Sequence, residues 1–285
     1  MIRKCVFLSL ITLGIIFISN PCFGATVGNP MDLDVPSRSA LLRDQAVNQA
    51  LNDYEQIIKV KASLDLEFVF DKKLNTTSEV TNAKIKGQWF MAKLGIDFFS
   101  RVEPYVKFGL ADLNAKWRQN NADDIDVESG NGFAWGGGIK GIIIELEDMG
   151  LRLTGDVQYR TADLDAGDIT RSGTTVVDSG ADFNVEEWQA ALVLSKKFEL
   201  PLKWQSIFVV PYTGITVSDS TVDVKVKDPS LPGYDLSLFD ANNKTAHGFL
   251  IGCDIMPSMT SSFIYSVELR LASETALTLG GALKF

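Results

Sequence analysis

Apolar and polar side chains alternate with a period of two along most of the chain beyond residue 58. In the segment 59–70, Val60 and every second residue to Phe70 are apolar, while Lys59 and every second residue to Glu67 are polar. The same alternation recurs in 151–160 and 263–271. Successive side chains of a β-strand point to opposite faces, so each segment is predicted to be a strand with one apolar and one charged face.

Weaker forms of this pattern bring the predicted number of strands to about ten. They occupy 86–98, 105–117, 133–144, 186–196, 207–218, 247–256 and 276–285. We expect the glycines Gly136–Gly138 to interrupt one of them, where a curved sheet needs close approach of the backbone.

The connections between these strands alternate between long and short. The long or polar connections are 71–83, 118–132, 161–184 and 219–246, with a polar tip at 273–275. The tight connections are 99–104, 145–150, 197–203 and 257–261. Long loops at one end and short turns at the other are typical of an up-and-down barrel in the outer membrane, and an even strand number places both termini at the short-turn, periplasmic end.

Alternation alone also fits a soluble β-sandwich, so strand length and aromatic placement decide between the two. The clearest stretches approach the 9–11 residues that a tilted strand needs to cross a bilayer. Trp117, Trp135 and Trp188 fall where strands meet long connections, and Trp204 and Tyr105 fall near short ones, as in two interfacial belts. We therefore predict that 57–285 form an all-β, closed, antiparallel up-and-down transmembrane barrel.

The first 24 residues have the order of a secretory signal peptide. Arg3 and Lys4 precede an apolar stretch at 5–19, and cleavage is expected before Ala25. The polar segment 25–56 follows, with a short helix predicted between Pro36 and Tyr54. This segment either plugs the barrel or lies in the periplasm.

The C-terminal end resembles the signal that the barrel-assembly machinery reads in outer-membrane proteins. The matching positions are a polar residue, Thr278, a glycine, Gly280, an apolar residue third from the end, Leu283, and a terminal aromatic, Phe285. The resemblance implies export to the outer membrane of a Gram-negative-type cell, with membrane lipid and that machinery as partners.

Three further segments resemble strands of the small outer-membrane barrels that include opacity-type adhesins. The upward strand of that superfamily is similar to Glu103–Gly109 and to Val210–Ile215, and its glycine-rich downward strand is similar to Phe133–Gly138. The resemblance implies location and fold, although eight strands rather than ten are usual there. It transfers no active site.

Composition excludes several classes of function. The 285-residue chain has a net charge of −9, or −11 without the first 24 residues, which hold two basic and no acidic residues. With one His and no basic cluster, binding to nucleic acid is not expected. Cys253 is the one cysteine beyond the signal, so we expect no disulfide, no metal site of the Cys/His type and no cofactor.

Charged residues on the polar faces of the strands are predicted to point into the barrel. This set contains seven cations and five anions: Lys59, Lys61, Asp65, Glu67, Lys93, Asp97, Lys107, Arg152, Asp156, Arg160, Glu268 and Arg270. They form either an ion-paired filling, because an unpaired charge in a narrow interior is costly, or the lining of a selective channel.

The long connections carry clusters of acidic residues. These are Asp123, Asp124, Asp126 and Glu128 in one connection and Asp163, Asp165 and Asp168 in another. Neither cluster has the spacing of a calcium-binding loop. We expect a structural or surface-interaction role, adhesin-like, in which these acidic loops meet an extracellular partner; the alternative is a narrow porin for ions or small solutes.

A third hypothesis is similarity to the omptin proteases, which are ten-stranded barrels with paired Asp residues and an Asp–His couple at the outer rim. His247, with Asp112 or Asp219, would have to supply that couple. No paired-Asp motif stands at a strand top, and a general base needs a partner within hydrogen-bond reach. We therefore expect no enzymatic activity and assign no catalytic residue.

Overall fold

The computed structural model describes residues 28–34, 58–75, 80–119, 122–177, 181–202, 206–227, 235–258 and 261–285. The expected signal peptide and the predicted helix between Pro36 and Tyr54 lie outside these residues. The described elements are η1 (Asp32–Asp34), β1 (Ile58–Lys73), β2 (Val80–Phe98), β3 (Val102–Gln119), β4 (Asp123–Ser129), β5 (Gly132–Leu146), η2 (Glu147–Met149), β6 (Leu151–Arg171), β7 (Thr174–Val177), β8 (Ala181–Lys196), β9 (Phe198–Pro201), β10 (Ser206–Lys227), β11 (Asp235–Asn242), β12 (His247–Met256), β13 (Phe263–Leu271) and β14 (Thr275–Lys284). No helix among them has the length and apolar character needed to cross a bilayer.

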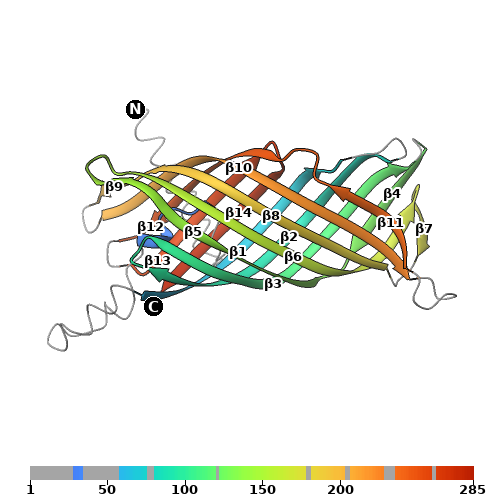
Figure 1. The fold of residues 1–285 in the computed structure, drawn as a ribbon, viewed down its shortest axis with the longest axis horizontal. Helices are drawn as coiled ribbons and strands as arrows, with labels where there is room; N and C mark the ends of the chain where they lie inside the picture. The colour runs from blue at the N-terminus through green and yellow to red at the C-terminus, as the bar shows by residue number, and fades with distance from the viewer. Residues whose placement is uncertain are drawn as a thin grey trace.

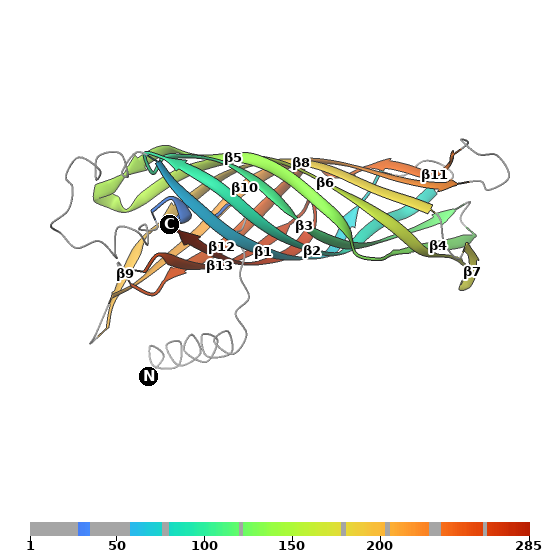
Figure 2. The same cartoon turned by 90° about the horizontal axis from the view of Figure 1, so that it is seen from below.

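The described strands form a closed antiparallel barrel (Figures 1 and 2). Ten strands follow one another around its wall in the order β1, β2, β3, β5, β6, β8, β10, β12, β13 and β14. The first and last strands close the ring, with Lys61 opposite Lys284 and Asp71 opposite Thr275. The predicted fold class and the number of ten are therefore confirmed.

The barrel has two sections along its axis, which differ in circumference. We call the end that holds Phe285 and the turns between β2 and β3 and around η2 the lower section. The end that holds β4, β7 and β11 is the upper section; in Figure 1 the lower section is at the left and the upper section at the right. The β13–β14 hairpin turns back at residues 272–274, and above it β1 joins the segment after β11 directly through the bridge between Leu74 and Asn243. The wall is thus ten strands around in the lower section and eight in the upper section.

Two strands of the upper section continue strands of the lower section. β4 and β5 both pair with β3 and β6, and β11 and β12 both pair with β10, with a break of a few residues in each case. The long connections expected at 118–132, 161–184 and 219–246 are therefore wrong in large part, because most of these residues extend the strands. The expected interruption at Gly136–Gly138 is also wrong, since β5 runs through it.

Polarity inverts between the two sections, and β3 shows it on one strand. In its lower part the exposed side chains of Val106 and Phe108 alternate with buried Tyr105 and Lys107. In its upper part Leu113, Ala115 and Trp117 are buried, while Lys116 and Arg118 are exposed. The lower section is therefore apolar outside and polar inside, and the upper section is the reverse.

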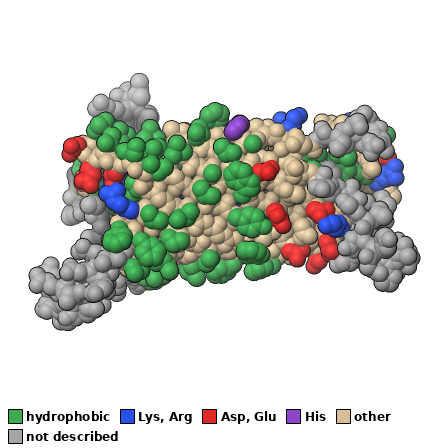
Figure 3. Space-filling view, viewed as in Figure 1, with side chains coloured by type: hydrophobic (Ala, Val, Ile, Leu, Met, Phe, Trp, Pro, Cys, Tyr) green, Lys and Arg blue, Asp and Glu red, His purple; other side chains and the backbone are tan. Residues whose placement is uncertain are grey.

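The exposed apolar side chains form one band around the lower section, the apolar belt. Figure 3 shows this band on one face of the molecule. Its members include Ile58, Val60, Phe70, Phe90, Leu94, Ile96, Val106, Phe108, Leu110, Phe133, Trp135, Ile139, Val157, Tyr159, Trp188, Leu192, Leu194, Ile215, Phe249, Ile251, Tyr265, Val267 and Leu271. No large apolar side chain is exposed in 71–75, 80–89, 111–119, 122–132, 160–175, 182–187, 216–225 or 241–248. The belt therefore ends sharply where the upper section begins.

Candidate functional site: the charged interior and its plug

The twelve charged residues predicted to point inward all lie on the inner face of the wall. Ten of them are buried, and Lys59 and Arg152 are half-buried at the lower end. The structure brings several of these residues into two layers of ion pairs, together with residues that the sequence pattern did not single out.

Residues 28–34, which we call the plug, lie inside the lower section. Asp32 is fully buried and accepts from the Nζ atoms of Lys61 at 2.6 Å, Lys140 at 3.2 Å and Lys93 at 3.5 Å. These lysines come from β1, β5 and β2, so one plug carboxylate joins three strands. Glu103 of β3 also pairs with Lys61 and Lys93 and completes this lower layer.

Hydrogen bonds from further strands hold the backbone and the ends of the plug. Lys284 Nζ donates to the carbonyl of Leu33 at 3.0 Å, and Arg152 Nη1 donates to the carbonyl of Pro30 at 2.9 Å. Asn29 Nδ2 donates to Ser266 Oγ at 2.6 Å, and the amide of Gly28 donates to Glu268 Oε2 at 3.0 Å. The open question of where residues 25–56 lie is answered for this part, which is inside the barrel.

The second layer lies above the plug and is built around two arginines. Arg160 donates to Glu67 at 2.9 and 3.0 Å and to Glu187 at 3.0 Å, and its guanidinium lies 4.3 Å from the ring centroid of Trp89. Arg270 pairs with the same Glu67 at 2.6 Å and with Glu274 at 3.1 Å. Lys72 links Glu187 and Glu274 at 2.9 and 3.4 Å, which closes the layer.

Several partners in these layers were missed in the sequence. They are Asp32, Lys72, Glu103, Lys140, Glu187, Asp254, Glu274 and Lys284. Glu103 and Glu274 lie in segments expected to be turns, Lys140 lies beside the glycines expected to break β5, and Asp32 belongs to a segment without strand periodicity. The strand register carries a usable signal, since Glu187 lies opposite Arg160 and Lys140 lies opposite Asp156.

Charge in the interior is almost balanced. Among the described residues, eight buried Lys and Arg side chains face ten buried Asp and Glu side chains. Above the second layer the bore is occupied by one apolar cluster that includes Leu113, Trp117, Leu164, Phe183 and Val222. The interior is therefore filled by ion pairs and two smaller apolar clusters, one around Met31 and one around Leu250, in its lower part, and by apolar packing in its upper part.

Two interior tyrosines lie against glycines of neighbouring strands. The Tyr105 hydroxyl donates to Asp156 at 2.8 Å, and the Tyr212 hydroxyl donates to Glu268 at 3.1 Å. A Cβ at Gly138 would stand 2.5 Å from the Tyr105 hydroxyl, and one at Gly252 would stand 2.2 Å from the Tyr212 ring. Glycine is required at both positions because each tyrosine ring lies at van der Waals distance from the backbone of the strand that holds the glycine.

The predicted aromatic belts need correction. Trp135 and Trp188 are exposed at the upper edge of the apolar belt, where Trp135 packs edge-on against Tyr159 with 6.0 Å between ring centroids. Trp117 and Tyr105, however, are buried inside the barrel, and Trp204 lies outside the described residues. Trp117 is on the same face of β3 as Tyr105 and Lys107 and therefore points inward, where the interior of the upper section is apolar.

The residues considered for an omptin-like couple lie on the outer surface. His247 is exposed opposite Val217 of β10, Asp219 lies two residues further along that strand, and Asp112 is on β3. No hydrogen bond or ion pair joins His247 to a carboxylate in the described residues. The described residues also contain no group of three or more His, Cys, Asp or Glu that could hold a metal ion.

The four C-terminal residues that resemble the barrel-assembly signal lie in β14 and just after it. Thr278 and Gly280 are buried on the inner face, Leu283 is half-buried on the outer face and Phe285 is exposed at the lower end. Thr278 Oγ1 accepts from Arg270 at 3.4 Å, so this position also contributes to the second layer.

The acidic clusters of the expected loops lie mainly on strands. Asp123, Asp124, Asp126 and Glu128 are on β4, and Asp163, Asp165 and Asp168 are on β6. Asp163 and Asp165 are exposed on the upper section, while Asp124 and Asp126 pair with Arg118 and Lys116 of β3. The acidic surface is therefore fixed on a rigid wall.

These observations define the fold as a closed ten-stranded antiparallel barrel with an apolar outer belt. No family model and no curated protein matches the sequence. Among solved structures, the chain is similar to the outer membrane protease OmpT from Escherichia coli, with 9% identity over 80% of this chain and 95% of that one and a TM-score of 0.43. It is also similar to the transport unit of the autotransporter AIDA-I from Escherichia coli, with 10% identity over 90% of this chain and 96% of that one and a TM-score of 0.39. The beta domain of the Bordetella autotransporter BrkA is similar as well, with 13% identity over 80% of this chain and 100% of that one and a TM-score of 0.37. At these values no family membership and no function is transferred.

Proposed function

We propose that the protein is an integral outer-membrane barrel with a closed bore, which acts through the surface of its upper section. The observation that carries the proposal is the inversion of polarity along the wall. A surface that is apolar around the whole circumference is stable in lipid, and a closed ring leaves no unpaired strand edge there.

The upper section supports exposure to water above the membrane. Its outward side chains are charged or polar and its interior is an apolar cluster, as in a water-soluble barrel. Trp135, Tyr159 and Trp188 mark the level at which the outer surface changes, and amphipathic aromatic rings favour that interface. The acidic residues of β6 belong to the surface available to an extracellular partner, which supports an adhesin-like role without enzymatic activity.

The filled interior supports a structural rather than a conducting role. An eight-stranded barrel is just wide enough for side chains to fill it, and the eight-stranded upper section contains Phe183, Leu164 and Trp117. Paired charges in the lower section leave little field to attract ions of one sign.

Conductance in a planar bilayer tests the proposal. We expect the refolded protein to be silent, and a variant with residues 28–34 replaced by a Gly-Ser segment to be silent as well, because the apolar cluster still closes the bore. Folding is verified by the heat-dependent gel mobility of a barrel in detergent. Steady openings of the intact protein would refute a closed bore and favour the channel.

A further inference from the structure

A row of lysines crosses the outer surface of the upper section at directly paired positions. Lys73 of β1 lies opposite Lys84 of β2, and Lys84 lies opposite Lys116 of β3. Lys244 continues the row on the other side, because its amide donates to the carbonyl of Lys73 at 2.9 Å. Four lysines thus lie side by side on neighbouring segments, whose backbones are about 5 Å apart across each strand pair.

Such a row is unfavourable in the free protein. Like charges at directly opposite positions of an antiparallel pair destabilise the sheet. A chain of net charge −9 nevertheless places these four lysines next to one another, although it has acidic residues on the same wall. The arrangement is explained if an anionic ligand binds across the row.

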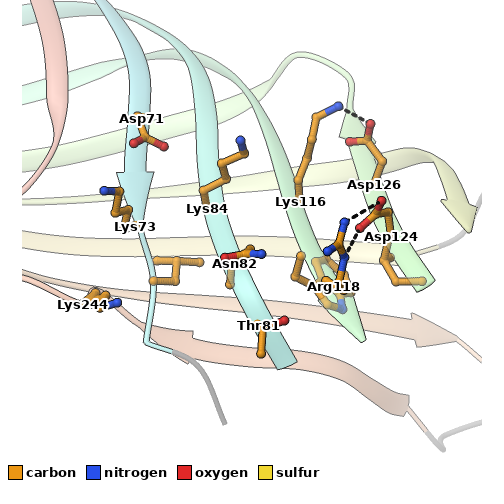
Figure 4. A pocket seen from close by; sticks show the side chains of 14 residues that line it. Asp71, Lys73, Thr81, Asn82, Lys84, Lys116, Arg118, Asp124, Asp126 and Lys244 are labelled. Atoms are coloured by element: carbon orange, nitrogen blue, oxygen red, sulfur yellow. Dashed lines mark hydrogen bonds and ion pairs between the residues drawn. The ribbon is translucent and has the colours of Figure 1, made fainter. Parts of the chain in front are cut away.

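A cavity of about 890 Å³ lies at this row (Figure 4). All four lysines line it, and Leu74 and Trp117 border it from the inner face of the wall, where their side chains are buried. Bulges distort the strands here, since the register shifts after Val69 in β1 and after Thr81 in β2, where Asn82 has a φ of 55°. Bulges redirect side chains at functional sites, and here they accompany a hollow in an otherwise regular wall.

Part of the charge around the cavity is already neutralised. Lys116 pairs with Asp126, and Arg118 Nε donates to Asp124 at 2.7 Å. Lys73, Lys84 and Lys244 make no ion pair with any described residue, and Asp71 is the one further carboxylate in the lining. The lining therefore retains a surplus of positive charge, and a concave surface concentrates that field.

The row begins at the edge of the apolar belt. Phe70, a member of the belt, precedes Lys73 by three residues on β1, and the tilt of the strands carries Lys84 and Lys116 further above it. A ligand at the row would therefore stand at the level of lipid headgroups and just above.

We propose that this lysine row binds a ligand with several phosphate groups, of the kind carried by phosphorylated saccharides. Several phosphate groups on one molecule can each accept from a different ammonium group of the row, and the cavity has room for the sugar ring that carries them. The source is either a phosphorylated saccharide headgroup in the membrane or a free phosphorylated molecule. This inference rests on the proposed placement of the upper section above the membrane.

Two probes distinguish the sources. Inositol hexakisphosphate is titrated calorimetrically into the refolded protein in non-ionic detergent at low salt. Lipid A, a bisphosphorylated glycolipid, is added to the same micelles and its effect on thermal unfolding is compared with that of phosphatidylcholine. The variants are K73Q/K84Q/K244Q and, as the matched pair of single changes, K84Q and K86Q; Lys86 points outward from the same strand but does not line the cavity.

We expect the triple variant to lose at least about tenfold in affinity, and K84Q to lose more than K86Q, because each lost ammonium removes a phosphate contact. Without ligand, the triple variant should unfold at the same or a higher temperature than the natural chain, since repulsion along the row is relieved. Weaker binding together with unchanged or higher thermal stability would show that the site is lost and the fold is retained. Binding of hexakisphosphate identifies a free ligand, and stabilisation by lipid A alone identifies a headgroup.

The lysine row is refuted as a site if hexakisphosphate does not bind and lipid A does not stabilise the protein. It is also refuted if the triple variant binds as tightly as the natural chain, or if K86Q loses as much affinity as K84Q. A silent, heat-modifiable barrel that binds neither probe would leave the proposed function intact. A conducting barrel that binds a probe through the row would refute the closed bore and leave the lysine row as a site.

Discussion

Asp32 shows how much of the lower section depends on one side chain. Its carboxylate is fully buried and faces three lysines from three strands, and no other described residue of the plug carries a buried charge. Removing one partner from a buried ionic cluster leaves the remaining charges without compensation. The plug is therefore expected to be a structural part of the barrel.

Replacing this carboxylate tests that role. We expect Asp32→Asn to lower the free energy of unfolding by about 3–5 kcal/mol, measured by urea denaturation in detergent micelles. Asp34→Asn is the control, because Asp34 is partly exposed and pairs with Arg152 at the rim. A loss of equal size in both variants would mean that the plug is held by its backbone bonds instead.

The pair Arg118–Asp124 allows a prediction at the surface of the upper section. The hydrogen bond from Arg118 lowers the pKa of the Asp124 carboxyl below its ordinary value. Since the folded pKa is depressed, the stabilisation by this pair is present at neutral pH and is lost as the pH falls through the folded pKa. We expect Arg118→Gln to return the pKa of Asp124 toward its ordinary value, measured by NMR titration of the carboxyl; Lys86→Gln should leave it unchanged.

At the scale of the strands, the sequence pattern was informative wherever apolar residues are large. The outward-facing sides of β3 and β14 follow from the sequence, since Val106 and Phe108 are exposed and Leu277 and Leu279 are half-buried on the outer face. The upper parts of the strands were read as loops because their inward residues, such as Ala162 and Ala166, are small and their outward residues are acidic. Pairs that join distant strands, such as Glu67 of β1 with Arg160 of β6, could not be identified, because these contacts depend on closure of the ring rather than on local spacing.

Arginine substitutions along β3 test the inversion of polarity within one strand. Val106→Arg should destabilise insertion into lipid by about 2–4 kcal/mol, since this position faces the bilayer. Asn114→Arg, also outward but above the belt, should change stability by less than about 0.5 kcal/mol. Leu113→Arg places a charge in the apolar cluster and should destabilise strongly, although it is adjacent to Asn114.

These effects are measured by refolding into vesicles of one lipid composition. Similar losses for Val106→Arg and Asn114→Arg would place the whole of β3 in the membrane and contradict the two-section wall.

At the scale of the molecule, the proposed placement in a membrane sets the apolar belt at the height of the bilayer. Trp135 and Trp188 mark its upper edge, while Trp89 and Trp117 are inside. Single-tryptophan variants, with the other tryptophans changed to Phe, should therefore separate into two groups in vesicles of lipids brominated near the headgroups. Fluorescence of Trp135 and Trp188 should be quenched several-fold more than that of Trp89 and Trp117. Strong quenching of Trp117 would mean that its strand is turned the other way.

The continuation of the wall beyond the belt has a mechanical consequence. On β3, nine residues separate Leu110, at the edge of the belt, from Gln119 at the strand end, which corresponds to roughly 20 Å of height for a strand tilted by about 40°. Because a hydrogen-bonded tube bends far less than a tethered loop, its rim is held at a set distance from the bilayer. A molecule captured there would be kept at that standoff, clear of the headgroup layer and within reach of the next cell or surface.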